Sequence, residues 1–203
     1  MNQVKDKKQG WLNRNIAGMG LTSFFSDMSH EMTTAVLPTF ITSLVGPAFA
    51  PQALGIVSGF SDAIASFVKI FSGWMSDKME RRKKIVVLGY AITGFFAGLT
   101  GFAASWGQAL AFRASAWLGR GLREPPRDAL IADSVPPQSY GRAFGFHRAM
   151  DSLGAVAGPL LVFFTLNALG VKNIFLLSFV PGFLAVVAIT LLEIGRASCR
   201  ERV

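Results

Sequence analysis

The sequence predicts an all-α membrane protein whose chain crosses the bilayer six times. Hydrophobic residues make up 51% of the chain and charged residues 16%, and the mean hydropathy is +0.43. Five Lys and Arg residues gather between positions 78 and 84, and the 20 uncharged residues of Ile85–Ala104 follow them directly. An α-helix needs about 20 apolar residues to span a bilayer. A globular domain has no use for such a run beside a basic cluster, so a polytopic helical protein is the expected class.

Six segments are long and apolar enough to be the predicted transmembrane helices. In order, they are residues 16–45, 54–75, 85–104, 109–132, 150–169 and 174–192. The first is longer than one straight crossing needs, so it is expected to tilt, to bend at Pro38 or to begin before the membrane. We therefore divide the chain into a polar tail over residues 1–15, a helical bundle over residues 16–192 and a short final segment.

The distribution of Lys and Arg predicts which side of the membrane each loop faces. Four of these residues lie in the amino-terminal tail and five between the second and third helices, whereas the first two loops on the other side contain none. Positive charge is concentrated on the cytoplasmic side of membrane proteins. We therefore expect a multi-pass protein of the cell (inner or plasma) membrane, with its amino terminus in the cytoplasm.

The sequence lacks the residues that several classes of function need. The net charge is +8, but the basic residues lie between apolar segments and form no exposed face, so we expect no nucleic-acid partner. A single cysteine, Cys199, excludes a disulfide framework and a cysteine-based zinc site. Because the sequence contains no HExxH motif, P-loop or nucleophile elbow, we expect neither an enzyme nor a bound cofactor.

The final segment, Glu193–Val203, differs sharply from the apolar residues before it. Its sequence, EIGRASCRERV, can be encoded by nucleotides that resemble a common sequencing adapter. We therefore expect this segment to be non-native, and we expect the natural chain to continue past residue 192 into a second six-helix half. The alternative is a genuine basic tail.

The loop between the second and third helices carries a pattern of fixed spacing. Its residues are Gly73, Asp77, Lys78, Arg81, Arg82 and Lys83. The pattern resembles the signature loop of the major facilitator superfamily, although Glu80 stands where that family usually has glycine. The resemblance implies one half of that fold, built from two repeats of three helices. It also implies a gating loop, in which Arg81 or Arg82 pairs with Asp133 at the inner end of the fourth helix and Asp77 lies beside them.

A second motif lies around the fifth helix. Its residues are Gly145, Gly154, Gly158 and Pro159. Their spacing resembles the motif that marks antiporters of the superfamily, although Val162 replaces its last glycine. Gly154 and Gly158 fall on one helical face, where they allow another backbone to approach, and Pro159 removes a helix hydrogen bond and permits a bend. A general packing face of small residues is the alternative.

Three ionisable residues share one face of the first helix, namely Asp27, His30 and Glu31. An ionised group near the bilayer centre costs roughly 2.5 to 3.5 kcal/mol, so each needs a partner or a wet cavity. We expect Asp27 or Glu31 to carry a transported proton. Two alternatives are that the membrane-spanning part begins later, which would place the three residues at the cytoplasmic surface of the membrane, and that they bind a metal ion.

The second helix carries Asp62 and Lys69 on one face, about 10 Å apart along its axis, so each is expected to contact another helix. In the fourth helix, Arg113 matches an arginine that the resemblance links to proton coupling, although Trp117 stands where a glycine is usual. We expect these residues to line the same cavity as the acids of the first helix.

Further charged residues surround Pro125 and Pro126, which interrupt the hydrogen-bond ladder of the fourth helix. We expect these residues, and a group at the start of the fifth helix, to line an inner vestibule that attracts an anion; a structural network between helices is the alternative. The vestibule residues are Arg120, Arg123, Glu124, Arg127, Asp128, Arg148 and Asp151, with His147 beside the last two.

These patterns favour a secondary active transporter. The resemblance implies proton-coupled export of small organic molecules, with the substrate bound at mid-depth against the first, second, fourth and fifth helices. The expected partners are the lipid bilayer, protons, the substrate and the carboxy-terminal six-helix half. One alternative is proton-coupled uptake or exchange of an anionic metabolite, and another is a membrane-embedded sensor or assembly subunit.

Overall fold

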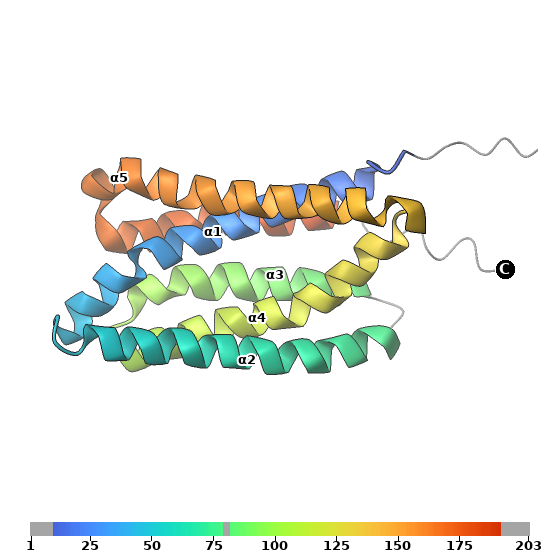
Figure 1. The fold of residues 1–203 in the computed structure, drawn as a ribbon. Coiled ribbons are helices and arrows are strands. Elements are labelled where there is room, and N and C mark those ends of the chain that lie inside the picture. The colour runs from blue at the N-terminus through green and yellow to red at the C-terminus, as the bar shows by residue number, and fades with distance from the viewer. Residues whose placement is uncertain (1–9, 79–81, 192–203) are drawn as a thin grey trace, which may run out of the picture.

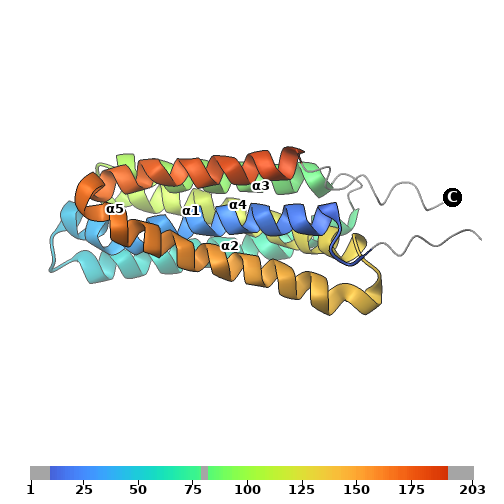
Figure 2. The same ribbon diagram turned by 90° about the horizontal axis from the view of Figure 1, so that it is seen from above.

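Six helical segments pack side by side in the computed structural model, which describes residues 10–78 and 82–191 (Figures 1 and 2). The α-helices are α1 (Arg14–Val45), α2 (Ala50–Lys78), α3 (Arg82–Leu99), α4 (Trp106–Asp133) and α5 (Tyr140–Leu191). Two 3₁₀ turns, η1 (Thr100–Phe102) and η2 (Pro137–Ser139), lie on either side of α4. The chain folds back within α5 at Gly170, whose φ of 73° and ψ of 164° are not helical.

The bend at Gly170 divides α5 into a first arm, residues 140–169, and a second arm, residues 171–191, which run side by side with α1 and α3 (Figure 2). The predicted all-α fold class is confirmed, and the two arms account for the fifth and sixth expected helices. By length and composition, three helical stretches of the described residues could span a membrane: Ala50–Lys78, Arg82–Phe102 and Pro137–Leu191. α1 and α4, with 32 and 28 residues, are also long enough to span a membrane, but their polar and charged side chains lower their hydropathy.

The fifth helix begins ten residues earlier than the expected start at residue 150, because η2 leads directly into Tyr140. The sequence places the ionisable residues His147, Arg148 and Asp151 at the start of the fifth helix. In the structure they lie within the first three turns of α5, where two of them, His147 and Asp151, are buried against other helices. The helix therefore begins before the expected transmembrane segment.

The two prolines of α4 do not break it, since the helix runs without interruption from Trp106 to Asp133. Pro126 has no N–H to donate to the carbonyl of Leu122, four residues earlier. The hydroxyl of Ser72 in α2 donates a hydrogen bond of 2.5 Å to that carbonyl instead. A side chain from a neighbouring helix thus satisfies a backbone group that proline leaves free, as a membrane protein requires.

The buried apolar residues form separate clusters towards the two ends of the bundle. One includes Phe40, Ile41 and Phe175, and the other includes Ile16 and Ile189. Polar and charged side chains lie between them, at the middle of α1 and α4. The described ends of the chain, the end of α2, the start of α3 and the α4–α5 connection all lie at one end of the bundle (Figure 1).

Candidate functional site

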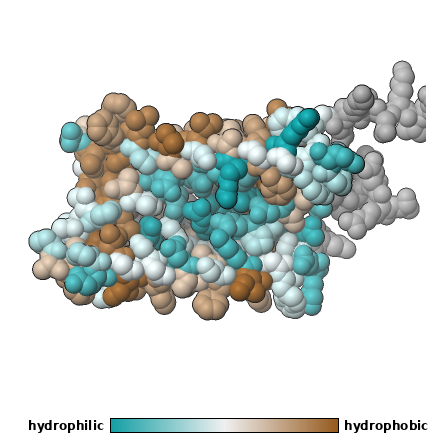
Figure 3. All heavy atoms as spheres, in the orientation of Figure 1, coloured by the Kyte–Doolittle hydropathy of each residue, from teal (hydrophilic) through white to brown (hydrophobic). Residues whose placement is uncertain are grey.

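Hydrophilic side chains gather at the centre of one face of the bundle (Figure 3). This polar face is formed by α1, α2, α4 and the first arm of α5, the four segments that were expected to line a substrate cavity (Figure 1). Its half-buried or exposed charged residues include Asp27, Glu31, Lys69, Arg120, Glu124 and Arg127. A membrane protein does not expose so many charges to lipid, so this face is suited to an aqueous cavity.

Glu124 joins α2 to α4 at the polar face. One carboxylate oxygen lies 2.6 Å from Lys69 Nζ and the other lies 3.0 Å from Arg120 Nε. Because one acid neutralises only one of its two cationic partners, this group of three keeps a net positive charge. The prediction that Lys69 contacts another helix is confirmed.

Trp117 of α4 is the centre of a second cluster on this face. Its indole N–H donates a hydrogen bond to Asp62 of α2, which confirms that Asp62 also contacts another helix. The guanidinium of Arg113 lies 4.0 Å from the centre of the indole ring, and the imidazole of His30 lies 4.3 Å from it. Trp117 therefore contacts Asp62, Arg113 and His30, three ionisable residues that the sequence indicated on three different helices.

Arg123 is the most deeply buried charged residue of the site, with 2% of its surface exposed. Its Nη1 donates a hydrogen bond of 2.6 Å to Ser26 Oγ, and its Nη2 lies 4.0 Å from a carboxylate oxygen of Asp27. Its guanidinium also stacks 3.9 Å from the ring centre of Tyr90 in α3. Arg123 thus ties α4 to α1 and α3, as the alternative of a structural network proposed.

The three ionisable residues of α1 lie near the middle of that helix. α1 begins at Arg14, and a rise of 1.5 Å per residue puts Asp27 about 20 Å along the axis from this start. His30 Nε2 lies 4.0 Å from Glu31, which forms no other ion pair among the described residues. The described part of the chain contains no group of three potential metal ligands, so it does not support the metal-site alternative.

A buried hydrogen-bonded chain connects α1 to the first arm of α5. His147 Nε2 lies 2.7 Å from Ser23 Oγ, and His147 Nδ1 lies 3.4 Å from Asp151 Oδ2. The hydroxyls of Ser23 and Tyr90 are 3.5 Å apart. Arg148 is exposed and belongs to none of the ion pairs found in the described ranges. His147 and Asp151 therefore join the buried hydrogen-bonded chain, and Arg148 does not.

At the end of the bundle where the described chain begins and ends, Arg82 pairs with Asp133. Arg82 Nη1 lies 2.7 Å from Asp133 Oδ2, and Arg82 Nε donates to the carbonyl of Ser76. The expected pairing is confirmed for Arg82, whereas Arg81 and Glu80 lie outside the described residues. Asp77 and Lys78 are both exposed at the end of α2, and Asp77 is absent from the ion pairs of the described segments.

The structure does not require glycine at position 73. A Cβ added to Gly73 would lie 3.9 Å from its nearest neighbour, Pro125, which is an ordinary van der Waals contact. No other described helix therefore approaches closely at Gly73. Another glycine makes such a close approach, since a Cβ on Gly121 of α4 would lie 2.6 Å from the carbonyl oxygen of Ala65 in α2.

Reversing the charge of Arg82, alone or together with that of Asp133, tests how much this ion pair contributes to the stability of the bundle. Both side chains are partly exposed, at 24% and 36%, so Arg82→Glu is expected to lower the free energy of unfolding by only about 0 to 1 kcal/mol. The double variant Arg82→Glu/Asp133→Arg is expected to recover that loss in thermal unfolding of the full-length protein. A double variant as unstable as the sum of both single variants would contradict the pairing.

Two of the three motif glycines of α5 pack against the backbone of α1. A Cβ on Gly154 would overlap the carbonyl oxygen of Phe24, and one on Gly158 would lie 2.7 Å from that of Met28. A Cβ added to Gly145 would have no atom within 4 Å among the described residues. Pro159 lies within the helical first arm, and the sharp turn of α5 comes later, at Gly170.

The remaining expected vestibule residues, Arg127 and Asp128, pair with each other at 3.0 Å. The Arg127 side chain is 12% exposed and that of Asp128 is 50% exposed, so the pair extends from the interior to the surface. Every arginine between positions 120 and 127 therefore has an acidic neighbour. Their role in attracting an anion stays a prediction.

Comparison with known proteins identifies the family. A profile of the Major Facilitator Superfamily matches residues 19–198. The chain belongs to this superfamily. An uncharacterized MFS-type transporter of Methanocaldococcus jannaschii is 37% identical over 91% of this chain and 46% of its own length. Multidrug resistance protein MdtH of Cronobacter sakazakii is 34% identical over 60% of this chain and 29% of its own length.

Solved structures of this superfamily share the fold. A bacterial homolog of the human lysosomal transporter Spinster, in an inward-facing and unoccupied conformation, has a TM-score of 0.74 at 19% identity, covering 91% of this chain and 43% of that one. A peptide transporter POT in complex with sulfate has a TM-score of 0.76 at 19% identity, covering 89% and 38%. The chain is thus an integral membrane protein of a transporter family, not an enzyme, and it spans about half the length of its relatives.

Proposed function

We propose that the full-length protein exports small organic molecules in exchange for protons, and that this chain forms one wall of its transport cavity. The observation that carries the proposal is the polar face. Charged residues of α1, α2 and α4 gather at the centre of this face, with apolar side chains around them (Figure 3). A relative that is named a multidrug resistance protein supports export.

The polar face needs a cover, because charged groups on it would otherwise meet lipid. The M. jannaschii relative is about twice as long as the aligned part of this chain, which supports a second six-helix half on the other side of the cavity. Alternating access would then be a rocking of the two halves about that site. The basic residues Arg14, Lys78 and Arg82 lie at one end of the bundle, and we place that end in the cytoplasm.

Glu31 is a better proton carrier than Asp27. Asp27 lies within ion-pair distance of the buried Arg123, so its protonation would leave a buried cation without its counter-ion. The one ion-pair partner of Glu31 in the described part of the chain is the imidazole of His30, and the Glu31 side chain is 33% exposed. Glu31 can therefore gain and lose a proton without breaking an ion pair of the core.

The Arg82–Asp133 pair, with Asp77 nearby on α2, would act as a latch at the cytoplasmic end. An ion pair of this exposure contributes little to stability. Its suggested role is to favour one of two conformations of the transporter, since a small free energy is sufficient to bias such an equilibrium.

Replacing Glu31 with glutamine is expected to abolish exchange that depends on the proton gradient, since the amide binds no proton in this pH range. The probe is ethidium, an organic cation, in inverted membrane vesicles that contain the full-length protein. Acidifying the vesicle interior should drive ethidium uptake by the unaltered protein, and a protonophore should stop it. With the same acidified interior, the Glu31→Gln variant should take up only as much ethidium as the unaltered protein does without a proton gradient.

Thr39→Val is the control, because Thr39 is an exposed residue of the same helix that the proposed mechanism does not use. It should transport ethidium as the unaltered protein does. Gradient-driven transport by Glu31→Gln would refute the role of Glu31. Ethidium uptake that is insensitive to the protonophore in every variant would refute proton coupling itself.

Transport of an anionic metabolite is a second candidate, favoured by Arg113. This residue is 7% exposed, and its Nε has no hydrogen-bond partner among the described residues. A buried donor without a partner is costly, so a substrate oxygen could satisfy it. Uptake of a radiolabelled dicarboxylate in the same vesicles, lost in Arg113→Met but not in Glu31→Gln, would support this candidate over cation export.

A further inference from the structure

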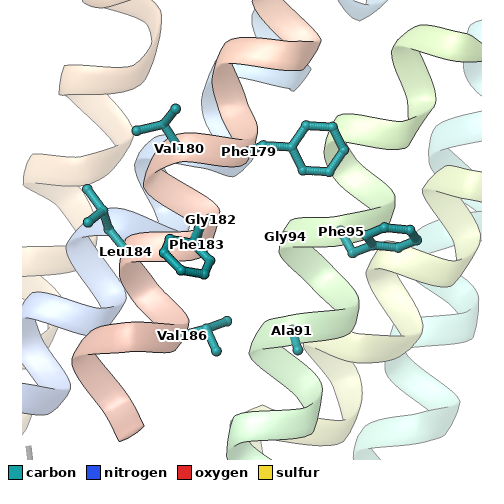
Figure 4. Close-up of a pocket in the computed structure, with 9 residues that line it drawn as sticks. All are labelled: Ala91, Gly94, Phe95, Phe179, Val180, Gly182, Phe183, Leu184 and Val186. Carbon is teal, nitrogen blue, oxygen red and sulfur yellow. The ribbon is translucent and has the colours of Figure 1, made fainter. Parts of the chain in front are cut away.

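An apolar groove of about 620 Å³ lies between α3 and the second arm of α5 (Figure 4). Its lining residues are Ala91, Gly94, Phe95, Phe179, Val180, Gly182, Phe183, Leu184 and Val186. None of them carries a polar side chain that could orient a polar substrate. α3 and the second arm of α5 are not among the four segments that form the polar face, so the groove is separate from that face (Figures 1 and 2).

Two glycines form the floor of this groove. A Cβ on Gly94 would lie 3.2 Å from the Cα of Gly182, so the two backbones touch there. Larger side chains flank the contact, and Phe95 and Phe183 are 55% and 67% exposed. The groove is therefore a channel between aromatic walls that opens outward, as a binding site for a hydrocarbon chain requires.

Basic residues lie at one end of the groove. Lys84 is exposed at the start of α3, and it precedes Leu88, Ala91 and Phe95 at intervals of four, three and four residues, which places all four on one helical face. Lys83 Nζ donates a hydrogen bond of 3.4 Å to the carbonyl of Thr190, near the end of the second arm. A positive charge thus lies in line with the apolar channel.

The α3 residues that line the groove lie about one leaflet's depth from Lys84. With a rise of 1.5 Å per residue, Ala91 and Phe95 lie about 10 and 17 Å along the axis from Lys84. The hydrocarbon of one leaflet is about 15 Å deep, half of the bilayer core. We propose that the groove binds one acyl chain of an anionic phospholipid whose phosphate lies at Lys84.

Native mass spectrometry of the full-length protein, purified without lipid, tests this site with phosphatidylglycerol and phosphatidylcholine of identical acyl chains. One lysine near an anionic headgroup favours binding about fivefold. Phosphatidylglycerol is therefore expected to bind about fivefold more tightly, and Lys84→Gln is expected to remove this preference while both lipids still bind. Equal binding of both lipids by the unaltered protein would overturn the proposal.

Ala91→Phe is expected to fill the channel and to lower binding of both lipids at least fivefold. Ala63→Phe is the matched control, because Ala63 is an exposed alanine of α2, and it should bind both lipids as the unaltered protein does. Unchanged lipid binding by Ala91→Phe would overturn the proposal. So would a lipid-free dimer that Ala91→Phe dissociates, since the groove would then bind a second copy of the chain.

Discussion

Replacing Gly154 with leucine is expected to lower the free energy of unfolding of the full-length protein by about 3 kcal/mol, near the upper end for overpacked sites. The added Cβ would overlap the carbonyl oxygen of Phe24, which is backbone and cannot rotate away. α1 and the first arm of α5 would have to separate. The measurement is unfolding of the purified protein, by heat or by denaturing detergent.

Gly145→Leu is a control from the same helix and the same motif. No atom lies within 4 Å of the Cβ that it would add, so its effect should stay within about 0.5 kcal/mol. Equal losses in both variants would show that leucine is harmful anywhere in α5 and that the contact with α1 is not the cause. The comparison separates the packing role of Gly154 and Gly158 from any role of Gly145.

The number and order of the helices could be predicted because apolar length and basic loops are local features of the sequence. The start of α5 could not be predicted in this way. A charged residue there can be exposed or can be buried against another helix, and the local sequence does not distinguish the two. Arg148 is exposed, whereas Asp151, three residues later, is buried beside His147. Only the packing of α1 against α5 decides which of these side chains becomes buried.

Some contacts within the site could be predicted from the sequence, and others could not. The partners of Asp62 and Lys69 were expected on another helix, because each residue lies on a helical face and needs a partner in the membrane. The partnership of Ser23 with His147 joins residues 124 positions apart, and no local pattern indicates it. The role of Tyr90 was missed for the same reason, since an isolated tyrosine in an apolar helix is unremarkable until Arg123 stacks on it.

Arg123 shows why a charge in this bundle can be structural. It is almost fully buried, yet it contacts a hydroxyl, a carboxylate and an aromatic ring from two other helices. Replacing it with methionine keeps much of the side-chain length but leaves Asp27 without its cation. Breaking a buried pair in this way costs about 3 to 5 kcal/mol, so Arg123→Met is expected to lower the free energy of unfolding by that amount.

The double variant Asp27→Asn/Arg123→Met is expected to be more stable than Arg123→Met, because it removes both charges and leaves neither one buried alone. Arg148→Met, at an exposed arginine, should change stability by about 0.5 kcal/mol at most. If the double variant were no more stable than Arg123→Met, the stacking on Tyr90 and the hydrogen bond to Ser26 would account for the loss. If Arg123→Met were as stable as the unaltered protein, Arg123 would be free to serve the substrate.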